Sequence, residues 1–127
     1  GLSKAGIEER AVAIFGDSSF FHSALPALCN AAHNRSQALM IVLDNRSTAT
    51  SGLQSNPGVD RDARGRIAPA LDIGEIARAC GLERVIMIEA SSPESSLVAH
   101  FRDALAQRAP TLMIVRIDPP GEPTGLN

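Results

Sequence analysis

The chain has 127 residues, of which 44% are hydrophobic and 20% are charged, and its formal net charge is −2. This length suits one compact domain with a buried core. With four Phe, no Trp and no Tyr, a mildly acidic chain lacks the basic and aromatic surface of a nucleic-acid-binding protein. The longest apolar run is about seven residues, far short of the roughly 20 that span a bilayer. Because no signal peptide is visible either, we expect a cytoplasmic domain that binds neither nucleic acid nor membrane.

Short runs rich in Val and Ile predict strands that are buried on both faces. In chain order these runs are Ala11–Phe15, Leu39–Leu43, Val85–Ile88 and Leu112–Ile117. Stretches with helical spacing separate the runs. They are Ser23–His33, Asp72–Ala79 and a last helix that begins at Ser92-Pro93-Glu94. This alternation of strand and helix predicts an α/β fold, with a parallel sheet covered by helices.

Capping residues mark the ends of these helices. Asp72 is the expected N-cap of the second helix, with Glu75 three residues later. Ser92 is the expected N-cap of the last helix and Pro93 its first residue. Pro26 fits its helix only within the first turn. The apolar stripe expected on the last helix consists of Leu97, Phe101, Ala104 and Leu105.

The pattern predicts one domain over residues 1–117, followed by a loosely ordered Pro/Gly-rich tail over residues 118–127. A long irregular stretch, about Arg46 to Ala70, lies inside the domain, and a loop of that length is usually functional. Because the chain begins at Gly1 and not at Met, we expect it to be truncated at its amino end. The two cysteines, Cys29 and Cys80, are expected to be buried free thiols. The sequence has no Cys-x-x-Cys pattern, so it does not predict an iron–sulfur cluster or a zinc site.

Polar residues follow the first two predicted strands. The first strand runs into Gly16-Asp17-Ser18-Ser19, and the second runs into Asp44-Asn45-Arg46-Ser47. In an open parallel sheet, ligands bind beyond the carboxyl ends of the strands. Oxygen atoms from a carboxylate (Asp17) and a side-chain amide (Asn45) are suitable ligands for Mg²⁺, which takes the rest of its six oxygens from phosphates and water.

By itself, the segment Gly16-Asp17-Ser18 is more typical of an ordinary turn at a strand end than of a metal–phosphate site. The second polar loop favours the metal–phosphate interpretation. One strand–helix–strand unit separates the two loops, so both are expected at the same edge of the sheet. Gly16 would let the backbone turn sharply near phosphates, and Ser18 and Ser19 would donate hydrogen bonds to them.

With both elements in place, the sequence resembles the thiamine diphosphate-binding families. Gly16-Asp17-Ser18 and Asp44-Asn45 stand where the family motif has Gly-Asp-Gly and a doublet that ends in Asn. A closer likeness, over about Val12 to Gly58, is to the thiamine-binding domain of indolepyruvate ferredoxin oxidoreductase, large subunit. It rests on the runs Gly16–Ser23, Pro26–Leu28, Asn30-Ala31, Leu43–Arg46, Ser51-Gly52, Gln54 and Pro57-Gly58.

The resemblance implies a role for each matching residue. Asp17 and Asn45 would be side-chain ligands of Mg²⁺, and Ser47 would offer its backbone carbonyl. Contacts to the diphosphate would come from Gly16, Ser18 and Ser19, and Thr48 and Thr50 would lie near the diphosphate or the thiazolium ring. His22 either faces the cofactor or substrate or is bonded to backbone at a helix start. His33 and His100 are expected at the surface or in packing.

The resemblance also implies that this domain is one half of a site in an oligomer. The Glu that contacts the pyrimidine ring of the cofactor belongs to another domain or subunit, and Glu75, Glu89 and Glu94 here look like cap or surface residues. The implied reaction is the oxidative decarboxylation of a 2-oxo acid, with ferredoxin and coenzyme A as partners. The isolated chain is expected to bind the cofactor poorly and to catalyse nothing.

Two departures from the family pattern are Leu53, where a polar residue is expected, and the lack of cluster-binding cysteines. The missing cysteines suggest an alternative, the small subunit of a non-oxidative 2-oxo acid decarboxylase of the sulfopyruvate or phosphonopyruvate kind. A third hypothesis is a non-catalytic domain that keeps the fold as an interaction module.

Overall fold

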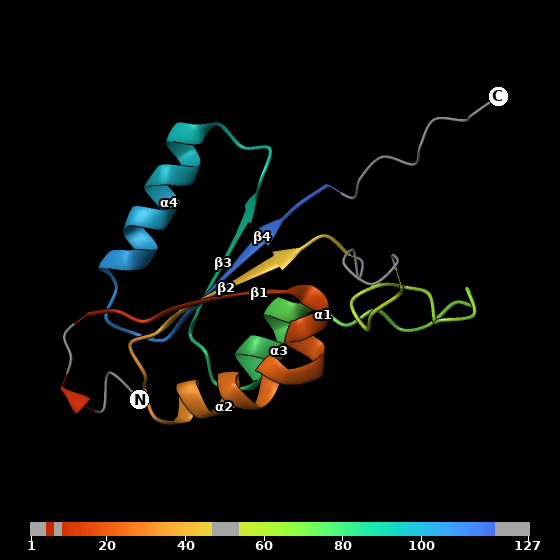
Figure 1. Cartoon of the computed structure of the whole chain (residues 1–127), viewed down its shortest axis with the longest axis horizontal. Coiled ribbons are helices and arrows are strands. Elements are labelled where there is room, and N and C mark those ends of the chain that lie inside the picture. The colour runs from red at the N-terminus through yellow and green to blue at the C-terminus, as the bar shows by residue number, and fades with distance from the viewer. Residues whose placement is uncertain (1–4, 7–8, 47–53, 119–127) are drawn as a thin grey trace.

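A single parallel sheet organises the molecule (Figure 1). The computed structural model describes residues 5–6, 9–46 and 54–118, and within them four strands form one sheet in the order β1-β2-β4-β3. The strands are β1 (Val12–Gly16), β2 (Leu39–Asp44), β3 (Arg84–Glu89) and β4 (Thr111–Arg116). Their bounds differ from the predicted ones by at most one residue at each end. The predicted parallel sheet is therefore confirmed.

Helices cover both faces of the sheet (Figure 1). In chain order they are α1 (Asp17–Ser19), the π-helix η2 (Phe20–Ala24), α2 (Leu25–His33), α3 (Ile73–Ala79) and α4 (Glu94–Ala106). On one face, α2 and α3 enclose a core around Leu28, Ala77 and Ile114. On the other face, α4 packs Ala104 against Ile41 and Met113. None of the helices among the described residues is long and apolar enough to cross a membrane.

The prediction that every strand is buried on both faces is correct for β2 and β4 only. In β1, Val12 is 45% exposed and Ile14 is 64% exposed. These two side chains lie beside Leu39 and Ile41 of β2, on the face that α4 covers. The core under α4 is built from β2, β4 and β3, so an edge strand next to it keeps its side chains exposed. Sequence runs alone do not distinguish a central strand from an edge strand.

The first helical segment begins earlier than predicted. Helical backbone starts at Asp17, directly after β1, and continues through η2 into α2. Pro26 lies in the first turn of α2, as expected. Proline lacks the N–H that an α-helix would donate to the carbonyl four residues earlier, and its ring crowds that carbonyl. The wider π-turn, in which the N–H of Leu25 donates to the carbonyl of Phe20, precedes the proline and gives its ring room.

The helix ends were predicted with mixed success. Asp72 is the N-cap of α3, and its Oδ1 accepts a hydrogen bond from the N–H of Glu75 at 2.8 Å. The prediction for α4 is wrong by one residue: Pro93 occupies the N-cap position with an extended ψ of 140°, and no side chain caps the helix. In the apolar stripe of α4, Leu105 is 49% exposed, whereas Ala104 is fully buried.

The prediction for the cysteines is correct in one respect and wrong in the other. Both cysteines are free, as predicted. They are not buried: Cys29, on α2, is exposed, and Cys80, which ends α3, is only partly buried. An apolar helical stretch shows that one face of the helix is buried, but it does not show that each small residue in it lies on that face.

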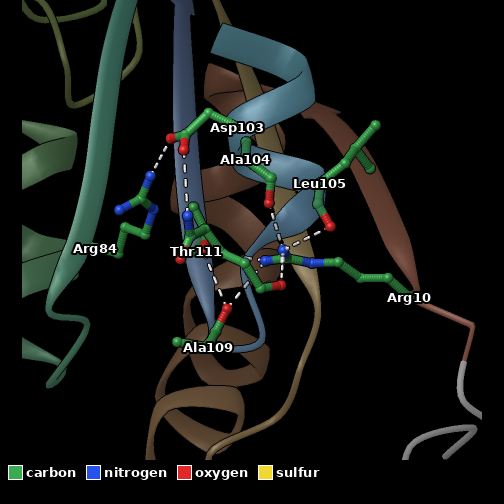
Figure 2. A network of polar contacts seen from close by, with 8 residues as sticks. Arg10, Arg84, Asp103, Ala104, Leu105, Ala109 and Thr111 are labelled. Carbon is green, nitrogen blue, oxygen red and sulfur yellow. Dashed lines mark hydrogen bonds and ion pairs between the residues drawn. The ribbon is translucent and has the colours of Figure 1, made fainter.

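Arg10 joins the amino ends of the strands to the end of α4 (Figure 2). Its guanidinium donates hydrogen bonds to the carbonyls of Ala104, Gln107 and Ala109, and to Oγ1 of Thr111. A cation at a helix C-terminus satisfies carbonyls that lack partners within the helix. Burial, with a smaller contribution from two nearby Arg side chains, lowers the pKa of Arg10. The side chain thus fastens residue 10 to residues 104–111.

Arg10→Ala is expected to lower the free energy of unfolding by about 2 kcal/mol or more, because several carbonyls lose a charged donor at once. Arg10→Lys keeps the charge but not the planar fork, so it should recover only part of the loss. Urea unfolding measures both variants. Arg102→Ala, on the exposed side of α4, is the control and should stay within about 0.5 kcal/mol of wild type. An Arg10→Ala midpoint equal to that of wild type would contradict the role of this side chain.

Candidate cofactor site at the carboxyl edge of the sheet

The two polar loops lie at the same edge of the sheet, as expected. Strand β1 pairs with β2 in parallel, and Gly16 at the end of β1 is the partner of Leu43 in β2. Asp17 and Asp44 therefore leave the sheet side by side at its carboxyl edge. The short helix α1 begins at Asp17, so the chain turns into helical backbone at the point where a ligand would meet it.

The carboxylate of Asp17 is buried, with 2% of the residue exposed. Its Oδ1 accepts a hydrogen bond from the N–H of Ser18 at 2.8 Å. Its Oδ2 accepts one from Nδ2 of Asn56 at 2.9 Å. A carboxylate offers about four lone-pair positions. Among the described residues, hydrogen bonds occupy two of these positions, one on each oxygen.

Asn56 is the functional residue that the sequence did not reveal. It is 8% exposed, and its Oδ1 accepts a hydrogen bond from the N–H of Gly58 at 2.8 Å. A Cβ on Gly58 would come within 3.0 Å of the Phe21 ring, so this turn packs tightly against η2. Asn followed by Pro57-Gly58 is a turn signal that could have located the bend. Nothing in the sequence pointed to the contact with Asp17, 39 positions away.

Gly16 does not turn sharply, contrary to the sequence argument. Its φ of −79° and ψ of 166° are extended angles that any residue adopts. A Cβ on Gly16 would nevertheless meet no atom of the described residues within 4 Å. As far as these residues are concerned, a ligand has room to approach the backbone there.

The structure brings together some of the predicted site residues. Ser18 and Asn45 are half-buried at the carboxyl edge, and Ser19 is exposed. His22 is exposed in η2, and both alternatives for its role stay predictions. His33 and His100 are exposed, as expected for surface residues. The remaining predicted residues, Ser47, Thr48 and Thr50, lie outside the described residues, as does Leu53.

Asp44 supports the second loop. Asp44 is 8% exposed, and its Oδ2 lies 3.5 Å from Nη2 of Arg116 on β4. Its Oδ1 accepts a hydrogen bond from the N–H of Arg46 at 3.2 Å. Arg46 has a left-handed φ of 53°, which turns the chain away from β2 directly after Asn45. A small cavity of about 30 Å³ lies next to this turn, between Asp44, Gly58 and Asp72. Asp44 therefore shapes the turn that carries Asn45.

The described part of the long loop, residues 54–72, is irregular, as predicted, but it has its own hydrogen bonds. Asp62 accepts hydrogen bonds from Arg66 and from the N–H of Arg64. The side-chain bond from Arg66 holds the pKa of Asp62 below its usual range. The N–H of Leu71 donates to the carbonyl of Pro57 at 2.8 Å, which links the turn of Asn56 to the start of α3.

Acidic and amide side chains thus stand at two adjacent strand ends, on the edge of a parallel sheet at which ligands bind in such folds. Comparison with known families agrees. The family described as "Thiamine pyrophosphate enzyme, C-terminal TPP binding domain" matches residues 1–115. The chain belongs to this family of thiamine pyrophosphate-binding domains.

Curated relatives carry the name indolepyruvate oxidoreductase subunit IorA. The protein of Methanothermobacter marburgensis is 48% identical over 81 residues, which are 64% of this chain and 13% of the relative. That of Pyrococcus horikoshii is 46% identical over 87 residues, 68% of this chain and 13% of the relative. That of Pyrococcus abyssi is 38% identical over 104 residues, 82% of this chain and 16% of the relative. The chain thus spans about an eighth to a sixth of the length of these relatives.

Solved structures share the fold. An enzyme from Mycobacterium smegmatis described as thiamin diphosphate-dependent matches with a TM-score of 0.65 and 27% identity, over 94% of this chain and 20% of that chain. The thiamine diphosphate-dependent 4-hydroxybenzoylformate decarboxylase of Rhodococcus jostii RHA1 matches with a TM-score of 0.61 and 23% identity, over 94% and 22% of the two chains. The second likeness shows the fold alone.

Asn56→Ala is expected to lower the free energy of unfolding by about 1–3 kcal/mol, because it leaves Asp17 and the Gly58 N–H without their buried partners. Asn56→Asp keeps the shape but sets two carboxylates against each other, so it should destabilise more near neutral pH than in mild acid. Urea unfolding at both pH values measures these effects. Asn34→Ala, on an exposed helix end, is the control. Equal stability of Asn56→Asp at the two pH values would contradict the Asp17–Asn56 contact.

Proposed function

We propose that this chain binds the diphosphate end of thiamine diphosphate, through Mg²⁺, in a 2-oxo acid oxidoreductase of the indolepyruvate type. The family match carries the cofactor assignment. The position of Asp17 and Asn45 at adjacent carboxyl ends of the sheet, with side-chain oxygens of the kind that Mg²⁺ prefers, supports the metal assignment. The names of the curated relatives support the oxidative reaction over the non-oxidative alternative.

In this proposal the residues of the chain bind and orient. Asp17 and Asn45 hold the metal ion with their side-chain oxygens, and Ser47 adds its backbone carbonyl. Ser18 and Ser19 donate hydrogen bonds to the diphosphate, with Thr48 and Thr50 nearby. The backbone at Gly16 lies open to the phosphate oxygens. When bound, thiamine diphosphate supplies the nucleophilic carbon and the electron sink that decarboxylation of a 2-oxo acid requires.

The chain is one side of a shared site in this proposal. Glu75, Glu89 and Glu94 are exposed, and Glu75 forms an ion pair with Arg78 at 2.9 Å. A Glu from another domain or subunit contacts the pyrimidine ring, and the working enzyme is an oligomer. The electron acceptor is ferredoxin and the acyl acceptor is coenzyme A. The site of action is the cytoplasm.

Ligand-dependent unfolding tests the metal–diphosphate site. Mg²⁺ with thiamine diphosphate, and also Mg²⁺ with inorganic diphosphate, should raise the midpoint of thermal unfolding. At ten times Kd the expected gain is about 1.4 kcal/mol, or roughly 4 °C. Thiamine without phosphates, or thiamine diphosphate with a chelator, should have no effect, because one ligand lacks the diphosphate and the other lacks the metal ion. Calorimetric scans of the purified chain measure the shift.

Variants of Asp17 test whether this side chain binds the metal ion. Asp17→Ala should abolish the stabilisation, and the isosteric Asp17→Asn should reduce it while keeping the fold. Asp60→Ala, which removes an exposed carboxylate of the long loop, is the matched control and should bind like wild type. Equal shifts in wild type and Asp17→Asn would contradict the metal role. No shift with any ligand, in the chain or in a longer protein that contains it, would favour a non-catalytic interaction module.

The purified chain is expected to release no CO₂ from a 2-oxo acid, even with cofactor and Mg²⁺, because the pyrimidine-contacting Glu lies elsewhere. Coupled CO₂ assays with indolepyruvate and smaller 2-oxo acids test this. Turnover by the chain alone would contradict the shared site. Iron analysis of the complex purified from its source then separates the two reaction types. A ferredoxin-linked oxidoreductase should contain iron–sulfur clusters, and a complex without iron would favour the non-oxidative decarboxylase.

A further inference from the structure

Two thiols meet where α2 and α3 pack against each other. Sγ of Cys29 lies 3.0 Å from Sγ of Cys80, although the residues are 51 positions apart in the chain. Cys29 is exposed in the middle of α2, and Cys80 ends α3 with its side chain packed against the core under these helices. The pair lies away from Asp17, because Cys29 is about 18 Å further along the helical segment.

The geometry is close to that of a disulfide. The S–S bond is about 2.0 Å long, so the two sulfur atoms need to approach by only about 1 Å. Rotation of two helical side chains covers such a distance without movement of the helices. Among the described residues, no group of three His, Cys, Asp or Glu side chains is placed to hold a metal ion, so the pair is not part of such a group.

The two thiols differ in their surroundings. Burial, with a smaller contribution from Cys29, raises the pKa of Cys80 to about 11. Near neutral pH the Cys80 sulfur therefore keeps its proton and is a poor first nucleophile. Cys29 is accessible from solvent. An oxidant from solution would meet Cys29 first, and Cys80 would then attack a sulfur that is already in contact with it.

We propose that Cys29 and Cys80 form a reversible disulfide that clamps α2 to α3. The oxidant is a small-molecule disulfide of the glutathione class. The Cys29 thiolate attacks one sulfur of the oxidant, which forms a mixed disulfide and releases one thiol. Cys80 loses its proton and attacks Sγ of Cys29, which forms the Cys29–Cys80 bond and releases the second thiol. The two cysteines are oxidised by two electrons, and the small disulfide is reduced to two thiols.

The disulfide would join two segments that also lead to the carboxyl edge of the sheet. The helical segment that ends in α2 begins at Asp17, and α3 begins next to Leu71, which is bonded to the Asn56 turn through Pro57. A covalent link between the helices therefore restrains the two segments that the Asp17–Asn56 hydrogen bond also joins. The link does not contact Asp17 itself, so ligand binding at the edge should persist in the oxidised chain. The inference does not depend on which ligand binds there.

Equilibration in buffers with graded ratios of reduced and oxidised glutathione tests the proposal. Dilute protein is acid-quenched, alkylated and analysed by mass spectrometry. Before alkylation, the oxidised chain should be lighter than the reduced chain by the mass of two hydrogens. On alkylation the reduced chain should gain two alkyl groups and the oxidised chain none, and digestion of the oxidised chain should yield one cross-linked peptide pair. The midpoint of thermal unfolding should rise by roughly 5 °C or more, because the bond closes a long loop, and dithiothreitol should reverse the rise.

Serine variants are the matched controls. Oxidation of Cys80→Ser should stop at a mixed disulfide between Cys29 and glutathione. Cys29→Ser should react slowly with oxidised glutathione, because its remaining thiol, Cys80, is partly buried. Neither variant should gain thermal stability on oxidation. Wild-type protein that carries glutathione on either cysteine at equilibrium, that forms disulfide-linked dimers, or that resists oxidation at every ratio would overturn the proposal. These readouts are independent of thiamine diphosphate, so they are separate from the tests of the cofactor site.

Discussion

A buried carboxylate has to be paired, and this requirement organises the candidate site. Asp17 is 2% exposed, and removal of a charge from water is costly unless hydrogen bonds replace the hydration. The Ser18 N–H supplies one bond from the turn that follows β1, and Asn56 supplies the other from the long loop. Asn56 is held in turn by the N–H of Gly58, so this part of the long loop is tied to the end of β1.

The order of strands and helices could be predicted because it depends on local patterns. Apolar runs of five or six residues mark β2 and β4, and Asp72 with Glu75 marks the start of α3. Features that depend on tertiary position could not be predicted in this way. Ile14 has the residue type of a buried strand position, but β1 lies at the edge of the sheet and the side chain is exposed. Whether a strand is central or at an edge depends on the order of strands in the sheet, and short apolar runs do not encode that order.

The candidate site shows the same division. Asp17 and Asn45 could be placed at one edge because a strand–helix–strand unit fixes where two parallel strands end. Asn56 could not be found, because its partner is distant in the chain and its own turn looks ordinary. The sequence does not predict the π-helix at Phe20–Ala24, because Pro26 indicates only that a regular α-helix is disturbed before it. The proline does not indicate whether the helix stops, bends or widens there.

The thiol pair and the cofactor edge belong to the same helical layer. Both α2 and α3 pack their apolar sides on one core, which includes Leu28, Ala77 and Ile114. That layer carries at one end the carboxylate we assign to the metal ion and, further along, the two sulfur atoms. Asp17 and Cys29 also belong to one continuous helical segment, which runs from α1 through η2 into α2.

The contact between Arg10 and the residues before β4 has a consequence for how the chain folds. The three described strand pairs are all parallel, so none of them can form by closing a short hairpin. Arg10 also bonds to the carbonyls of Ala104 and Ala109, which lie 94 and 99 positions later in the sequence. Contacts between such distant residues must close long loops, which costs entropy before the contacts stabilise the fold, so we expect slow folding for a domain of this size. During synthesis β1 can pair with β2 early, but Arg10 can bond to these carbonyls only after residues 104–109 have been made.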